Sequence, residues 1–389
     1  MKRVVWSVVA AVALASFAQL APAQTSKDRA YVDAVLDGLV KAGVLKADQA
    51  VQIKKDAETA ATGAAAGEKP KKSWTDTVKV SGYGQVRWQF SPDADDPDNT
   101  FSLRRARLKV TANPVERVEG QFEVAGDETE VGITDAWLQY QLDEAGEWRV
   151  RGGQQRVPFG FEVPQSTQSV IPLEISWVGR TMFPGSRDLG AVVYWTDPKD
   201  RELFEQAKKT DFGTGDYGNV AIGVFNGQGM SEPEANSGKT ICVRLAKPFT
   251  VGERYVEGGV SYWAGQFHSA AAAADLDDNL LGVHLYVPPR PIGLQAEYYN
   301  GETEGDDING FYAMGLWRPR EDGVAFVRYD EYNGPRKGKG LGNVFDRERW
   351  SLGYAHMVNS STKATIQYDF QDTAAGSDDL LGVQLQSSF

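Results

Sequence analysis

Apolar and polar residues alternate one by one along most of the chain beyond residue 73. Between Val78 and Trp88, valine, glycine and tryptophan occupy the even positions, and mainly polar residues occupy the odd ones. Side chains alternate between the two faces of a β-strand, so such a segment is a ribbon with one apolar and one polar face. The chain ends inside this pattern, with Leu381, Val383 and Leu385 on the same face as the terminal Phe389.

Similar ribbons recur throughout residues 73–389. Beyond the first, they cover residues 106–110, 121–125, 134–140, 148–153, 189–195, 220–224, 241–245, 256–262, 281–285, 294–298, 312–316, 325–329, 350–354, 364–370 and 380–389. The total of about sixteen is even, as a closed bacterial barrel requires. The pattern therefore predicts an all-β membrane protein, an antiparallel transmembrane β-barrel of about sixteen strands over residues 73–389.

The expected connections alternate in kind. Short turns are predicted at 113–116, 288–291, 319–322 and 358–361, and long polar loops at 91–100, 226–238, 300–309, 331–346 and 371–379. Short periplasmic turns and longer surface loops are typical of outer-membrane barrels. Residues 196–216 break the rule, because this turn is long, charged and helical in character.

The N-terminal residues follow other patterns. Lys2 and Arg3 precede an apolar run that ends near Leu20, and Ala21-Pro22-Ala23 is a small-residue cleavage site, so residues 1–23 are predicted to be a secretory signal peptide. Residues 24–72 have helical spacing followed by a linker. They are either a periplasmic helical hairpin that self-associates as a coiled coil or a partly ordered tether, and they could bind peptidoglycan or another periplasmic partner.

Composition excludes several classes of protein. The net charge of −12 argues against a nucleic-acid binder. A single cysteine, Cys242, permits no intramolecular disulfide. His268, His284 and His356 have no metal-ligand spacing, so no metal, cofactor or catalytic residue is expected, and the protein is not predicted to be an enzyme.

If the apolar faces meet lipid, the polar faces line the interior, and in the early strands that face is basic. The inward candidates are Lys79, Arg87, Arg105, Arg107, Lys109, Arg149, Arg151, Arg244, Arg328, Arg349 and Lys363. Fewer acidic residues share this register: Glu119, Glu123, Asp135, Glu257, Glu297, Asp330 and Asp369. Guanidinium groups along a water-filled tube stabilise anions and repel cations, so the pattern predicts anion conduction.

Two further features complicate this interpretation. Barrels without selectivity also carry a basic wall, which acidic residues on an inserted loop offset. The corresponding loop here, from residue 156 to about 187, is nearly neutral, with Glu162, Glu174 and Asp188 against Arg156, Arg180 and Arg187. The outer loops are acidic, as in Asp93, Asp95, Asp96 and Asp98. Such carboxylates are either solvated loop tips, a barrier to anions, or ligands of divalent cations that bridge to lipopolysaccharide phosphates.

Aromatic residues cluster near strand ends, where membrane barrels carry interfacial girdles. The girdle candidates are Trp88, Phe90, Trp137, Tyr140, Trp195, Tyr262, Trp263, Tyr298, Tyr299, Trp317, Tyr329, Trp350 and Phe370. Contact with outer-membrane lipid is expected on this face.

Three segments resemble the phosphate-selective porin O and P family. Residues 101–108 (FSLRRARL) resemble its arginine-rich second strand, residues 153–162 (GQQRVPFGFE) the start of its constriction loop, and residues 39–45 its N-terminal helical region. The resemblance implies a homotrimeric outer-membrane porin with sixteen strands and a narrow anion-selective pore. It also implies that Phe389 belongs to the assembly signal, that Arg104 joins Arg105 and Arg107 in the pore, and that Pro158, Phe159, Gly160 and Glu162 lie in the constriction.

The resulting hypothesis is a channel for passive diffusion of small hydrophilic solutes that prefers anions such as phosphate. The family's phosphate specificity also depends on lysines near the constriction, and residues 156–187 contain none. A general or weakly selective diffusion porin therefore stays open as an alternative, as does a structural protein that residues 24–72 tether to the cell wall.

Overall fold

A computed structural model describes residues 77–389, apart from 93–97, 271, 336–345, 374–375 and 378, together with nine separate positions between 37 and 55. The chain forms two units, Met1–Val80 and Ser81–Phe389. In the first unit the nine described positions between 37 and 55 are all helical, and residues 78–80 belong to the first strand. The predicted signal peptide and linker lie outside the described residues.

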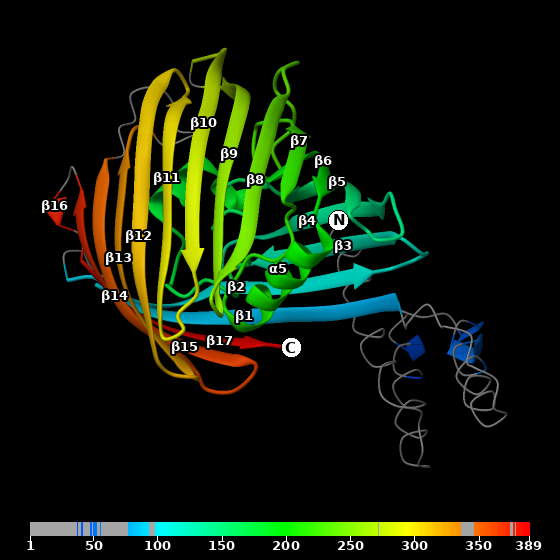
Figure 1. The fold of residues 1–389 in the computed structure, drawn as a ribbon. Helices are drawn as coiled ribbons and strands as arrows, with labels where there is room; N and C mark the ends of the chain where they lie inside the picture. Colours follow the sequence, from blue (N-terminus) through cyan, green and yellow to red (C-terminus); the bar gives the residue numbers. More distant parts are fainter. Residues whose placement is uncertain are drawn as a thin grey trace. The chain divides into compact units, whose positions relative to one another are not determined.

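The second unit is a closed antiparallel barrel of sixteen strands, which confirms the predicted fold (Figure 1). The strands are β1 (Val78–Phe90), β2 (Asn99–Ala112), β3 (Val118–Gly126), β4 (Val131–Gln141), β5 (Trp148–Arg156), β6 (Arg187–Trp195), β7 (Val220–Phe225), β8 (Thr240–Val251), β9 (Arg254–Ser269), β10 (Ala274–Val287), β11 (Ile292–Thr303), β12 (Asp306–Arg320), β13 (Gly323–Asn333), β14 (Arg347–Met357), β15 (Thr362–Thr373) and β17 (Leu380–Ser388). A two-residue strand, β16 (Gly376–Ser377), pairs with the end of β15.

Consecutive strands pair with each other, and β17 closes the barrel by pairing with β1, where Val86 lies opposite Leu385. Closure leaves no unpaired sheet edge, which is the condition for a sheet to stand in lipid. In the described part of the chain, no helix has both the length and the apolar character needed to cross a membrane.

The alternation divides the side chains between two faces of the wall. Apolar residues such as Leu138, Ile222 and Val383 point outward and are 39–64% exposed, whereas charged and amide residues point inward and are buried. An exposed apolar outer face and a polar inner face are the reverse of a soluble protein and are typical of membrane barrels.

The connections define two ends of the barrel. At the turn end, strands are joined by short segments such as 113–117, 252–253, 321–322 and 358–361; at the loop end lie the connections after β1, β3, β5, β7, β9, β11, β13 and β15. The helix expected in the exceptional turn is present as α5 (Pro198–Thr210). The predicted long loop at 300–309 is wrong, because β11 and β12 extend to a two-residue turn at Glu304–Gly305.

Three of the girdle candidates are also wrong. Trp137, Trp263 and Tyr299 are buried and face inward, since their neighbours Leu138, Tyr262 and Tyr298 occupy the exposed outer face. Each of these three aromatic residues stands one position before or after an outward residue, so strict alternation would have placed it inside.

Candidate functional site

The connection between β5 and β6, residues 157–186, folds back into the barrel. It contains α4 (Trp177–Met182) and a 3-10 turn, η2 (Pro184–Ser186). Phe159, Phe161 and Phe183 are at most 5% exposed and pack against inward aromatic residues of β9 to β11, including Trp263 and Tyr299. The loop is therefore a packed part of the interior.

Carboxylates on the wall hold this loop through its backbone. Glu297 accepts hydrogen bonds from the N–H groups of Phe161 and Glu162, both at 2.8 Å, and from the hydroxyls of Tyr299 and Tyr312. Glu297 thus uses both oxygens twice, so this point of attachment is fully satisfied.

A second attachment lies further along the loop. The N–H of Trp177 donates to Asp330 at 3.0 Å, and the N–H of Leu173 donates to the Gln367 side chain at 2.8 Å. Lys363 donates to the carbonyl of Val170 at 2.7 Å. Because these partners lie on β13 and β15, the loop spans the interior from one part of the wall to another.

One loop carboxylate gathers three arginines. Glu174 lies 2.8 Å from Arg87, 2.6 Å from Arg104 and 2.7 Å from Arg105. Burial alone would raise the pKa of Glu174, but the guanidinium groups of Arg105, Arg87 and Arg104 hold it well below its usual range. A single ionised carboxylate therefore faces three positive charges.

Two adjacent arginines point inward because the alternation of β2 changes phase. Phe101 and Leu103 are exposed on the outer face, two residues apart as in a regular strand. The next exposed residue is Ala106, three residues after Leu103 instead of two. Arg104 and Arg105 lie between these phases and both reach Glu174. Such a phase change turns one extra side chain inward, as a β-bulge does.

A second charged cluster follows on β2 to β6. Arg107 lies 2.8 Å from Glu123, and Arg187 contacts both Glu123 at 3.2 Å and Asp135 at 3.0 Å. A register shift between β3 and β4 makes Thr134 an extra residue, so Thr134 and Asp135 are both buried. Arg156 donates to the carbonyl of Val163 at 3.0 Å.

The remaining basic candidates fall into two groups. Arg151 is half-buried, donates to Gln139 and stacks on Trp137 with 4.1 Å between the guanidinium carbon and the ring centre. Lys109 is half-buried opposite Glu123 in the β2–β3 pair. Arg149 lies 2.7 Å from Asp216 at the turn end.

Arg244 and Arg328, by contrast, are completely buried between loop and wall. Arg244 pairs with Glu257 at 2.9 Å and donates to the carbonyl of Gly160, and Arg328 donates to the carbonyl of Glu174. These two side chains hold the loop rather than face open space. The carbonyl oxygen of Pro158 lies 3.5 Å from the Cys242 sulfur.

Sequence reasoning missed several contributors. Gln85 and Gln384 orient Arg105 and Arg87, and Tyr194 lies under Arg151. Their inward positions in the strand alternation were the sequence feature that could have identified them. Within the described residues there is no group of three histidine, cysteine or acidic side chains that could hold a metal ion.

A sixteen-stranded closed barrel with an apolar exterior, a charged interior and an inserted loop defines a porin-type barrel of the bacterial outer membrane. The family model for phosphate-selective porin O and P matches residues 78–291. The chain therefore belongs to the phosphate-selective porin O and P family, whose members are non-enzymatic channels.

Solved porin structures share the fold. OmpF of Salmonella typhi, in complex with daunomycin, matches at a TM-score of 0.57 and 13% identity, over 80% of this chain and 97% of OmpF. The outer-membrane channel DcaP of Acinetobacter baumannii matches at 0.54 and 14%, over 80% and 97%. The anion-selective porin of Comamonas acidovorans matches at 0.54 and 12%, over 80% and 99%. No curated protein matches the chain.

Proposed function

We propose that this porin passes small hydrophilic solutes passively and prefers anions such as phosphate. The observation that carries the proposal is the cluster in which Glu174 meets three arginines, because one carboxylate cannot neutralise three guanidinium groups. The excess positive charge lies where the inserted loop meets β1 and β2. A ring or line of such groups in a confined pore attracts anions and repels cations.

The exposure of these side chains supports the proposal. Arg104 is 28% exposed and Arg105 14%, whereas Glu174 is 12% exposed with both oxygens already paired. Arg107 and Arg151 continue the partly exposed basic line toward the turn end. The planar fork of arginine can give two parallel hydrogen bonds to a phosphate or carboxylate.

A weakly selective diffusion porin is the second candidate. Glu123 and Asp135 neutralise much of the charge on Arg107 and Arg187. The third candidate, a structural protein tethered to the cell wall, depends on residues 24–72. We further propose a homotrimer, as in the trimer form described for OmpT of Vibrio cholerae, with the N-terminal segment in the periplasm and lipopolysaccharide around the loop end.

Reconstitution in a planar bilayer under a salt gradient separates these candidates. We expect channel events with a reversal potential on the anion side. A reversal potential near zero would favour the weakly selective porin, one on the cation side would contradict anion preference, and an absence of events would favour the structural protein.

Reversing two of the basic residues tests the assignment directly. We expect Arg105→Glu with Arg107→Glu to lower the anion-to-cation permeability ratio roughly tenfold or more, because a unit charge about 4 Å from an ion contributes about 4 kcal/mol at an effective dielectric constant of about 20. Arg105→Gln with Arg107→Gln should produce a smaller shift in the same direction.

The matched control is Arg254→Glu with Arg320→Glu, which makes the same charge change at exposed positions of the turn end. If the control moves the reversal potential as far as the interior pair does, the interior arginines do not determine selectivity.

A further inference from the structure

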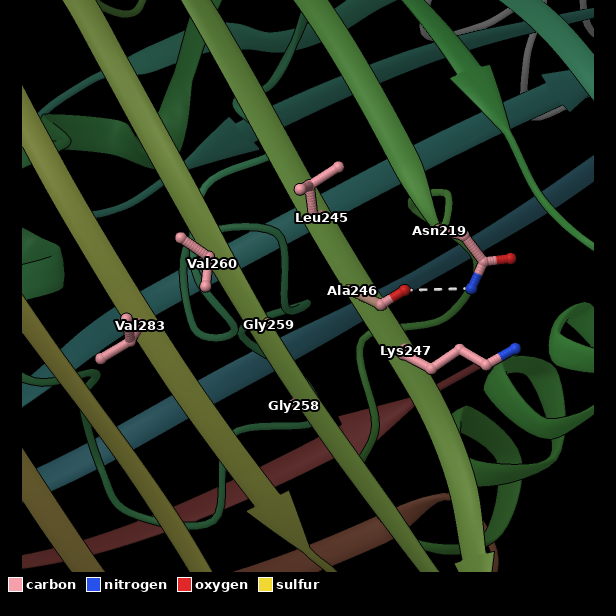
Figure 2. A pocket seen from close by; sticks show the side chains of 8 residues that line it. All are labelled: Asn219, Leu245, Ala246, Lys247, Gly258, Gly259, Val260 and Val283. Carbon is pink, nitrogen blue, oxygen red and sulfur yellow. Dashed lines mark hydrogen bonds between the residues drawn. The ribbon is translucent and has the colours of Figure 1, made fainter.

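The connection between β6 and β7, residues 196–219, is much longer than the other connections at the turn end. It begins with α5, whose first turn is capped by the Asp197 carboxylate and which buries Phe204 and Ala207. Lys247 of β8 reaches α5 and lies 2.6 Å from Asp200. Asn219 donates to the Ala246 carbonyl at 3.0 Å (Figure 2). The helix is thereby fixed to the wall.

After the helix, residues 211–216 run from one part of the wall to another. Asp211 pairs with Arg290, lies 3.7 Å from Arg318 of β12, and accepts the Tyr286 hydroxyl of β10 on its backbone carbonyl. Asp216, five residues later, lies 2.7 Å from Arg149 of β5. Strands β6 to β9 separate β5 from β10, so the segment is a chord across this side of the barrel.

The chord is inside the barrel and touches the inserted loop. The side chain of Gln165, in the loop, donates to the carbonyl of Phe212 at 2.6 Å. Phe212 packs against the interior core, and Tyr217 contacts the inward-facing Tyr194 with 6.4 Å between ring centres. Two inserted segments, one from each end of the barrel, therefore meet in the interior.

The ends of the chord are held firmly. Asp216 accepts hydrogen bonds from Arg149, Thr196 and Arg201, and Gly218 donates its N–H to the same carboxylate. Burial would raise the pKa of Asp216, but Arg149 and these hydrogen bonds keep it below its usual value. A segment clamped by ion pairs at both ends is a fixed part of the interior.

We propose that this chord, residues 211–216, forms a second constriction, at the turn end, which limits the conductance and the solute size of the channel together with the inserted loop. The physical reason is steric: a backbone that crosses the interior removes cross-section from the water path. The proposal requires only that the barrel conducts ions and is independent of whether it prefers anions.

Cysteine chemistry tests the proposal in the intact protein. The one native cysteine, Cys242, is completely buried, so an introduced thiol is the accessible one. The exposed Lys208 packs against Gly215 of the chord, whereas the exposed Lys199 lies at the opposite end of α5. Lys208→Cys and Lys199→Cys are therefore matched variants that remove the same charge from the same helix.

After a bulky neutral thiol reagent is added to the bilayer chamber, we expect single-channel conductance to fall roughly twofold or more for Lys208→Cys and to change little for Lys199→Cys. Equal effects on both variants, or no effect on either, would overturn the proposal. Anion preference is read separately from the reversal potential, so a failure here leaves the proposed function unaffected.

A second variant should change the single-channel conductance in the opposite direction. Replacing residues 198–216 with a short hairpin turn should raise conductance and admit larger uncharged polymers into the channel. An unchanged conductance in a folded barrel would also overturn the proposal; should the shortened chain not fold, the cysteine pair decides.

Discussion

Gly160 occupies the point where the inserted loop meets β11. Its φ of +62° lies in the left-handed region, and a Cβ there would collide with the Glu297 carboxylate and the Tyr299 hydroxyl. We expect Gly160→Ala to lower the free energy of unfolding by about 1–3 kcal/mol, because strain and collision act together. Denaturant titration in lipid vesicles measures the change.

Gly305→Ala is the control for that substitution. Gly305 also has a positive φ, of +82°, but an added Cβ would meet open space. A loss as large as that of Gly160→Ala would show that backbone strain alone, and not the contact with Glu297, accounts for the effect.

Residue by residue, strand alternation predicts which side of the wall a side chain occupies, and it fails where the backbone changes phase. Arg105 and Arg107 follow the regular pattern, but Arg104 points inward only because the phase of β2 shifts after Leu103. The extra residue Thr134 has the same origin. Each shift appears in the sequence as an odd step between outward apolar positions, from Leu103 to Ala106 and from Ile133 to Ala136, which a strict two-residue alternation overlooks.

Among the elements, we expect the inserted loop to respond to pH through Glu162. Glu162 lies on this loop in the barrel interior and not on a strand of the wall. Burial raises the pKa of Glu162 to about 7; Arg328 opposes the shift and Glu297 adds to it. The docked loop holds the proton more tightly than the undocked loop, whose Glu162 has a pKa near 4.5. Docking is therefore most stable below pH 4.5 and weakens as the pH rises through about 7.

We expect brief closures and current noise to be more frequent at pH 8 than at pH 5, and Glu162→Gln to remove this difference. Single-channel recording at the two pH values measures it. Glu232→Gln, at an exposed position of the loop after β7, should leave the pH dependence intact. Persistence of the full pH dependence in Glu162→Gln would exclude Glu162 as the group responsible.

Element lengths were harder to predict than element types. All ribbons became strands, but β11 and β12 extend well past their apolar positions, through polar residues that were expected to form a loop. Cross-strand hydrogen bonds continue regardless of side-chain polarity once the barrel wall projects beyond the apolar band. Residues 196–216 could be recognised as exceptional, but their course across the interior depends on contacts with Arg149 and Arg318, distant in sequence.

For the whole molecule, closure of the barrel depends on the last residues of the chain. The backbone of Phe389 makes two hydrogen bonds with Gly82, at 3.0 and 3.1 Å. Its ring lies over Gly82, in the space that a side chain there would occupy, and Phe389 is 73% exposed. The ring therefore contributes little packing within the barrel, whereas the backbone completes the β1–β17 pair.

The exposed ring and the hydrogen-bonded backbone of Phe389 can therefore have separate roles. We propose that the ring is read during assembly, as the resemblance implies, while the backbone closes the sheet. Phe389→Ala keeps both hydrogen bonds, so we expect the free energy of unfolding in vesicles to change by less than about 1 kcal/mol, since exposed side chains contribute little to stability. In cells, the folded fraction should fall several-fold, measured by the heat-dependent shift of the barrel in gel electrophoresis.

Leu385→Ala is the matched control, because Leu385 shares the exposed outer face of β17 and keeps its pairing with Val86. It should leave the folded fraction in cells near that of the unsubstituted protein. An equal loss in cells for both variants would mean that outward apolar area, and not the terminal ring, controls assembly. A large loss of stability in vesicles for Phe389→Ala alone would assign the ring a structural role in closure instead.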